Sequence, residues 1–249
     1  PRVVKNADTK VYICRRAHAP HEMSALVSHF LTLLQGGVML AYADRACGLC
    51  MEQLLLLYGT MLFVQREPLR RETPRTMASD LEVFEQLLGG AVEDAVKDGS
   101  NRQARANMLL GSMLAGQAFA NSPVAAVHAL AYPIGGHFKV PHGLSNALVL
   151  SHVLRFNSVV APTPYAEMAP HVFPHLAKLG TQEAASAFAE ELAKLSERCG
   201  LQTRLRDVGI PADAIDRLAS DAMNQTRLLT NNPRPLNESD ARSIYQAAW

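Results

Sequence analysis

From residue 76 to residue 249 the sequence shows one recurring pattern, in which runs of apolar residues at helical spacing end at glycine or proline. The first run extends from Asp80 to Asp98 and stops at Gly99, and the second extends from Gln103 to Asn121 and stops at Ser122-Pro123. Both runs have the spacing of amphipathic helices, and the residues after them are typical helix stops. We find no alternation of apolar and polar residues there that predicts a β-strand. The pattern favours an all-α fold, built as a helical bundle.

Signals for helix starts and stops predict the rest of this bundle. A short helix is expected over Val124 to Tyr132, because Pro133 is expected to end it. Pro141 suits a first helical position, and its helix is expected to run to about Phe156. Later helices should start at capping residues or prolines. These starts are Thr163-Pro164, Thr181 (with Gly200 as the stop), Pro211 (to Met223), and Asn237 with Asp240 (to Trp249).

Composition agrees with a helical domain and excludes several classes of protein. Alanine and leucine are abundant while aromatic residues make up only 6%, which favours helices over a β-sandwich. The formal net charge of +1 gives no argument for binding nucleic acid or an acidic membrane. The longest apolar stretch, Leu54 to Val64, is too short to span a bilayer. Neither nucleic acid nor a membrane is therefore an expected partner.

The four cysteines are too few for a disulfide framework, and the N-terminal residues show no apolar signal-peptide core. We therefore expect a reducing, cytoplasmic location. Cys47 and Cys50 have the C-x-x-C spacing of redox motifs and of zinc half-sites. They lack a second pair of ligands, and no βαβ pattern surrounds them, so neither role is favoured.

Residues 1–75 do not follow the helical pattern. Between about residue 11 and residue 75, the Cys47/Cys50 pair, a leucine run and several arginines show no sustained period. We predict a division near residue 75, with residues 1–75 as a poorly matching segment and residues 76–249 as the helical domain. The first segment is either a remnant of a domain junction or an altered sequence, as a reading-frame slip would produce.

Two histidines fourteen positions apart, His128 and His142, are the main candidates for chemistry. His128 lies near the end of an apolar, helix-compatible run, and His142 follows Pro141 at an expected helix start. The intervening Pro-Ile-Gly-Gly sequence is expected to form a turn. Two helices joined in this way can direct both imidazoles to one point, which is the start of a transition-metal site. The alternative is that both are core histidines with ordinary hydrogen-bond partners.

The segment around these histidines resembles the iron-containing (group III) alcohol dehydrogenases. The likeness covers about residues 76–249 and includes four blocks of sequence. They are Met113 to Asn121, His128 to Asn146 with Gly135-Gly136 and Pro141-His142-Gly143, Val153 to Asn157, and Asn231 to Asp240. The resemblance implies that this part is the family's helical C-terminal, metal-binding domain, which has a dehydroquinate synthase-like fold. In the family, an N-terminal α/β domain binds NAD or NADP. We do not recognise that domain here, because Gly36-Gly37 lacks the third glycine of a phosphate loop.

The resemblance also assigns roles to individual residues. The family's iron, sometimes zinc, is held by one aspartate and three histidines, and His128 and His142 match two of these histidines. The other two ligands belong to an Asp-x-x-x-His pair, and no aspartate in this sequence has a histidine four positions later. Tyr132 stands where many relatives carry a histidine that is not a ligand. Tyr132 and His137 are candidate catalytic residues.

Two further positions have both a structural and a functional interpretation. Gly135 and Gly136 are candidate cofactor-binding residues, and the alternative is that they only permit a tight turn. Asn146 lies four residues after His142, on the same helical face, so it either orients that ligand or bonds a neighbouring backbone group. His152, His171 and His175 are expected at the surface or at helix ends.

Two functions remain open. The first is an NAD(P)-dependent, metal-containing alcohol dehydrogenase, present here as its helical metal-binding portion and acting on a small alcohol or aldehyde. Relatives resembling maleylacetate reductase or glycerol dehydrogenase belong nearby, and we expect a homo-oligomer. The second is a non-catalytic helical module for interaction or oligomerisation. The missing Asp-x-x-x-His pair favours the second, whereas the dense match after residue 76 favours the first.

Overall fold

The computed structural model describes residues 4–6, 9–11, 89–121 and 124–249, with side-chain detail for 89–112 and 124–249. Within residues 89–121 and 124–249 every regular element is helical, which confirms the all-α prediction for this region. Residues 89–97 form one helix, and the named helices follow it along the chain. They are α5 (Arg102–Asn121), α6 (Ala126–Phe138), α7 (His142–Ser158), α8 (Pro162–Val172), η1 (Pro174–Leu176), α9 (Thr181–Arg198), η2 (Leu205–Val208), η3 (Ala212–Ala214), α10 (Ile215–Ala222), α11 (Thr226–Leu229) and α12 (Glu238–Ala248).

The only other regular elements in the described residues are the strands β1 (Val4–Asn6) and β2 (Thr9–Val11). They form one antiparallel pair in which Val4 lies opposite Val11. None of the described helices is both long and apolar enough to cross a membrane.

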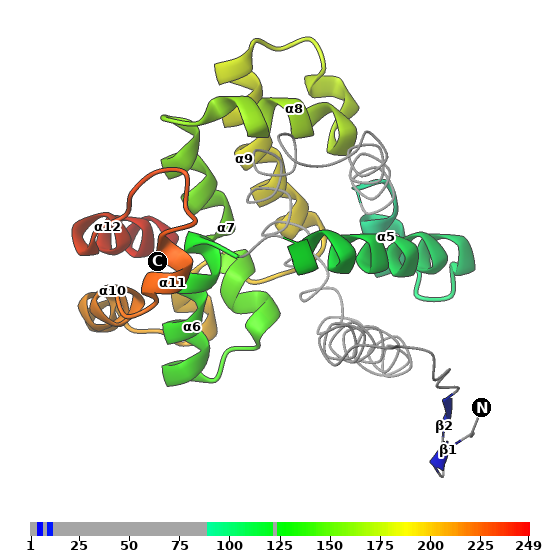
Figure 1. The fold of residues 1–249 in the computed structure, drawn as a ribbon, viewed down its shortest axis with the longest axis horizontal. Helices are drawn as coiled ribbons and strands as arrows, with labels where there is room; N and C mark the ends of the chain where they lie inside the picture. Colours follow the sequence, from blue (N-terminus) through cyan, green and yellow to red (C-terminus); the bar gives the residue numbers. More distant parts are fainter. Residues whose placement is uncertain (1–3, 7–8, 12–88, 122–123) are drawn as a thin grey trace, which may run out of the picture.

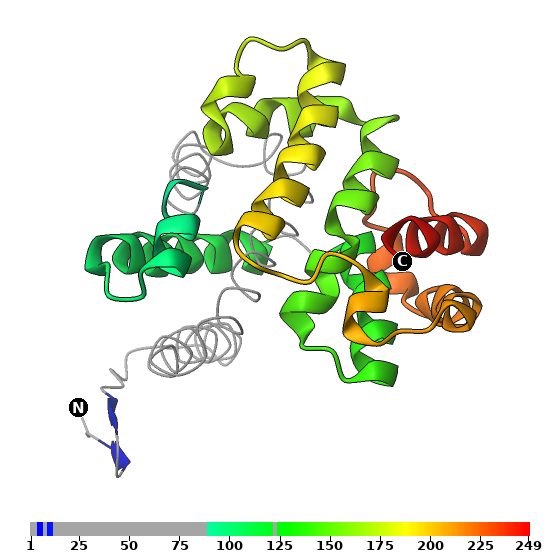
Figure 2. The same cartoon turned by 180° about the vertical axis from the view of Figure 1, so that it is seen from behind.

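The long helix α7 lies at the centre of the helical domain (Figures 1 and 2). It packs against α9 and α8 on one side and against α6 and α12 on the other. α10 completes the second group, because it contacts both α6 and α12. The buried face of α9 carries Ala185, Phe188, Leu192 and Leu195, which lie at the spacing of one helix face. α7 therefore joins the two groups of helices, and its first residue is His142.

Several helix ends agree with the sequence signals. Asn237 and Asp240 form a reciprocal capping box at the start of α12, with both bonds 3.0 Å long. Gly200 follows α9 with a φ of 76°, a conformation that favours glycine. Other starts were misplaced by a residue or two: α8 begins at Pro162 rather than near Thr163-Pro164, and Gly180 rather than Thr181 is the N-cap of α9.

The prediction that Pro133 ends its helix is wrong. Pro133 lies inside α6, which continues to Phe138. An internal proline removes one backbone hydrogen bond and costs roughly 3 kcal/mol. α6 tolerates this cost because it is buried along most of its length, including Pro133 itself and Ile134. Burial against α7 and α10 outweighs the local preference to stop.

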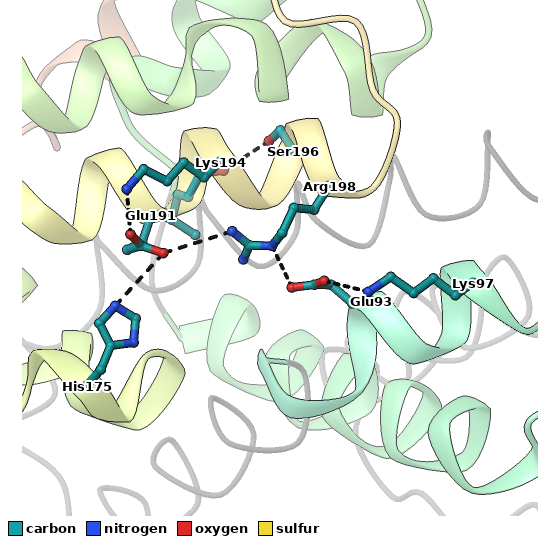
Figure 3. Close-up of polar contacts among 8 residues, drawn as sticks. Glu93, Lys97, His175, Glu191, Lys194, Ser196 and Arg198 are labelled. Carbon is teal, nitrogen blue, oxygen red and sulfur yellow. Dashed lines mark hydrogen bonds and ion pairs between the residues drawn. The ribbon is translucent and has the colours of Figure 1, made fainter.

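An ion-pair network connects the helix of residues 89–97 to α9 (Figure 3). Arg198 Nε contacts Glu93 Oε1 at 2.8 Å, and Lys97 Nζ contacts Glu93 Oε2 at 3.0 Å. On α9, Lys194 Nζ lies 2.9 Å from Glu191 Oε1. Desolvation opposes ionisation of Glu93, but its hydrogen bonds to Lys97 and Arg198 leave its pKa below the usual value. These contacts hold residues 89–97 against the rest of the bundle.

A pair of buried amides attaches the segment before α12 to the end of α7. Asn157 Nδ2 donates to Asn232 Oδ1 at 3.0 Å, and Asn232 Nδ2 donates to Asn157 Oδ1 at 2.7 Å. Both side chains are buried. Arg234 strengthens the same junction, because its guanidinium lies over the Phe156 ring and donates to the Phe156 carbonyl oxygen.

We predict that Asn232→Ala lowers the free energy of unfolding by about 2–3 kcal/mol, because it leaves the buried Asn157 amide without this partner. Urea denaturation of the full chain measures the change. Asn224→Ala, at an exposed position, is the control and should change the free energy by less than about 0.5 kcal/mol. Equal effects of the two substitutions would contradict the importance of the amide pair.

Candidate metal site

The rings of His128, Tyr132 and His142 gather where α6 meets the start of α7. The ring centroids of His128 and His142 are 5.1 Å apart. Those of Tyr132 and His142 are 5.9 Å apart, and those of His128 and Tyr132 are 6.2 Å apart. His128 and Tyr132 are four positions apart on α6, which places them on the same face of that helix. The two helices therefore bring three aromatic side chains to one place, as the spacing of the histidines suggested.

The connection between the helices differs from the predicted Pro-Ile-Gly-Gly turn. Gly135 and Gly136 lie within the last turns of α6, and the chain reverses at Lys139, whose φ is 57°. The Lys139 N–H donates to the Gly135 carbonyl oxygen, and Pro141 precedes the first residue of α7. A Cβ atom on Gly135 would lie 3.4 Å from the Val140 carbonyl oxygen, which is an ordinary van der Waals contact. The role of Gly135 and Gly136 in binding a cofactor stays a prediction.

His128 is a buried imidazole with a free nitrogen. Its side chain is 8% exposed, and its Nδ1 atom has no hydrogen-bond partner. Burial, and secondarily the nearby His142, lowers the pKa of His128 to about 3, so the ring is neutral near pH 7. A neutral imidazole with an unused lone pair is the form that binds a metal ion.

His142 lies at the rim of the site, where it is exposed although partial burial still lowers its pKa. The buried Asn146 lies one turn further along α7, on the same face, as predicted. Its Nδ2 atom donates to the His142 carbonyl oxygen at 3.2 Å and lies 3.3 Å from His142 Nε2, while its Oδ1 atom has no partner. Asn146 thus contacts both the backbone and the ring of His142, so the two alternatives given by the sequence coexist.

His137 faces another helix. It occupies the last turn of α6 rather than a loop, and its Nε2 atom lies 2.6 Å from Asp221 Oδ2 on α10. This contact joins α6 to α10 and gives His137 a structural role, while a catalytic role stays a prediction. Sequence reasoning missed Asp221, because it lies 84 positions away and carries no local signal.

The spacing of the two histidines fits one shared ion. A metal lies about 2.0–2.1 Å from a histidine nitrogen, which places it about 3.2 Å from the ring centroid. Two such ligands at a tetrahedral angle have centroids about 5.2 Å apart, close to the observed 5.1 Å. Among the described residues, however, no three side chains of the types His, Cys, Asp and Glu lie close enough to hold a metal together. His128 and His142 therefore form half of a ligand set.

The remaining histidines lie away from this site. His175 is exposed on η1 and His171 is partly exposed near the end of α8, as expected. His152 is half-buried on α7 beside Arg155. Burial, together with the Arg155 charge, lowers the pKa of His152 to about 4.

Comparison with known proteins identifies the helical domain. The model of the Fe-containing alcohol dehydrogenase family, C-terminal, matches residues 72–249. The chain belongs to the iron-containing alcohol dehydrogenase family. The long-chain-alcohol dehydrogenase 1 of Geobacillus thermodenitrificans is 40% identical over 164 residues, which is 66% of this chain and 42% of that protein. The 1,3-propanediol dehydrogenase of Klebsiella pneumoniae is 34% identical over 71% of this chain and 45% of that protein.

Solved structures of iron-containing alcohol dehydrogenases share the fold. A 1,3-propanediol oxidoreductase aligns with a TM-score of 0.72 and 28% identity over 81% of this chain and 51% of that one. The alcohol dehydrogenase from Oenococcus oeni aligns with a TM-score of 0.70 and 28% identity over 86% and 52%. The chain spans less than half the length of the two curated relatives. The division near residue 75 and the origin of residues 11–75 stay predictions.

We predict that His152 makes stability depend on pH. The unfolded chain binds a proton on this residue near pH 6.5 and the folded chain only near pH 4, so acid favours unfolding. The contribution of His152 is therefore fully present above pH 6.5 and is lost as the pH falls toward 4, at up to about 1.4 kcal/mol per pH unit.

Urea denaturation of the wild type and of His152→Gln at pH 8.0, 6.0 and 5.0 measures this dependence. As the pH falls, the free energy of unfolding of the wild type should decrease more than that of His152→Gln. A difference that stays constant from pH 8.0 to pH 5.0 would show that His152 titrates alike in both states.

Proposed function

We propose that this chain is the helical, metal-binding portion of an NAD(P)-dependent dehydrogenase that interconverts small alcohols and aldehydes. The observation that carries the proposal is the buried, neutral His128. Its Nδ1 atom has no hydrogen-bond partner, and its ring packs against the His142 ring. Family membership supports the reaction class, since the relatives are named for long-chain alcohol, 1,3-propanediol and lactaldehyde. The proposed ion is iron or zinc, and both accept imidazole ligands.

The residues of this chain have distinct roles in the proposed site. His128 provides a desolvated nitrogen at the floor, and His142 provides a second nitrogen at the rim. Asn146 limits rotation of the His142 ring through its contact with Nε2. The Tyr132 ring lies beside both imidazoles. Lewis-acid polarisation of the substrate oxygen is the chemistry that such an ion supplies when bound, and hydride exchange is that of the nicotinamide.

Substrate and nucleotide would approach from the open side of this site. His142 and Tyr132 are exposed, whereas His128 is enclosed behind them. Tyr132 and His137 remain the proposed catalytic residues, and Gly135 and Gly136 the proposed nucleotide contacts. Tyr132 has the stronger support, because His137 is engaged with Asp221. A nucleotide-binding domain would face this open side, so the reaction would occur between two domains.

A second function is favoured by one observation. No aspartate in the sequence is followed by a histidine four positions later, so the family's other pair of ligands is missing. This favours a non-catalytic helical module that keeps the fold and mediates interaction or self-association. A homo-oligomer is proposed for either function, and light scattering of the purified chain measures it.

We predict that the full chain binds Co²⁺ or Zn²⁺ through these two histidines. In calorimetric titrations, His128→Ala and His142→Ala should each weaken binding at least tenfold, because each removes one of two nitrogen ligands. The control is His175→Ala, which changes an exposed histidine on η1 and should leave metal affinity unchanged.

The same proteins separate the two proposed functions. Metal binding that depends on His128 and His142 supports the dehydrogenase, and fluorescence titration with NADH tests whether the chain also binds the nucleotide. A chain that binds neither metal nor NADH, yet folds and self-associates, would contradict the dehydrogenase and support the helical module.

A further inference from the structure

We propose that Tyr132 is a third ligand, through its phenolate oxygen, of an ion held by His128 and His142. The inference deepens the proposed function and rests on its metal site, but it changes the ligand set. Among the described residues, Tyr132 is the other aromatic side chain whose ring contacts both histidines. The resulting site has two neutral nitrogen donors and one anionic oxygen donor.

The positions of the rings fit this ligand set. A phenolate oxygen about 2.0 Å from a metal places the tyrosine centroid about 4.4 Å from that metal. The imidazole centroids lie about 3.2 Å from the metal. If the ligands make a tetrahedral angle at the metal, the tyrosine centroid should lie about 6.2 Å from each histidine centroid. The observed distances are 6.2 Å to His128 and 5.9 Å to His142. All three pairs of rings therefore have the spacing expected around one ion.

The local fold favours the same arrangement. Tyr132 follows His128 by one helical turn on α6, so both side chains lie on the face toward the start of α7. The buried Pro133 and Ile134 hold this part of the helix in place. Tyr132 is 43% exposed, so a proton leaving its hydroxyl group has direct access to water. Tyr132 is therefore both the ligand at the open side of the site and the ligand that must lose a proton.

Charge gives an independent argument. Two neutral imidazoles leave the double positive charge of a divalent ion without an anionic ligand, and an anionic ligand attracts that charge more strongly than a neutral one does. Among the described residues no carboxylate joins the two histidines in a metal-binding group. A phenolate supplies one negative charge at the site. An aspartate ligand would supply the same negative charge, but the sequence contains no Asp-x-x-x-His pair.

The proposed binding step is balanced by release of one proton. The divalent ion binds the two imidazole nitrogens and the tyrosine oxygen, the O–H bond breaks, and the proton passes to solvent. No oxidant or reductant takes part. With Cu²⁺ as the probe, a bound phenolate gives a charge-transfer band in the visible spectrum, which imidazole ligands alone do not give.

The test is a titration of the full chain with Cu²⁺ at pH 7.5, comparing the wild type with Tyr132→Phe and His128→Ala. The wild type should show the charge-transfer band, and Tyr132→Phe should bind Cu²⁺ at least tenfold more weakly, without the band. Tyr132→Phe should also release about one proton fewer per bound ion, measured in a weakly buffered solution. His128→Ala should weaken binding and reduce the band.

The possible outcomes separate this inference from the proposed function. Binding of Cu²⁺ that needs His128 but gives the same spectrum and proton release in Tyr132→Phe would overturn the phenolate ligand and leave the two-histidine site. Absence of any binding by the wild type would overturn both. Tyr132→Phe retains the ring and removes only a hydroxyl group, and its circular dichroism spectrum should match that of the wild type.

Discussion

The crossing of α6 over the start of α7 is the constraint on which the candidate site depends. Lys139, whose φ is positive, reverses the chain between the two helices. This connection places His142, the first residue of α7, against His128 near the other end of α6. The surrounding helices then enclose His128, so that its ring is neutral and one nitrogen has no protein partner. Without this packing, both histidines would be ordinary solvated bases.

Contacts between segments distant in sequence attach other helices to α6 and α7. His137 joins the end of α6 to Asp221 on α10, and the Asn157–Asn232 amide pair attaches the segment before α12 to the end of α7. The Glu93–Arg198 ion pair connects residues 89–97 to α9, which itself packs on α7. Each of these contacts joins segments distant in sequence, so together they fix α6 and α7 from several sides. A single surface ion pair contributes little to the free energy of unfolding, whereas breaking the buried amide pair leaves buried polar groups without hydrogen bonds.

The sequence was a good guide where structure follows from local chemistry. The cap that Asn237 and Asp240 form at the start of α12 and the end of α9 before Gly200 were predicted from spacing and residue type alone. It failed at Pro133, where a local rule predicted a helix end and burial of α6 overrode it. This difference arises from packing between elements distant in the chain.

By itself, the sequence determined the helical class of residues 89–121 and 124–249, the candidate pair His128 and His142, and the absence of an Asp-x-x-x-His pair. These three conclusions follow from residue identity and spacing, which are fixed before the chain folds. Only the tertiary structure decided that the two imidazoles lie 5.1 Å apart with Tyr132 beside both, and that His137 Nε2 lies 2.6 Å from Asp221 Oδ2. Such distances depend on how the helices pack, and packing that excludes water shifts the pKa of a side chain and decides which partners it contacts.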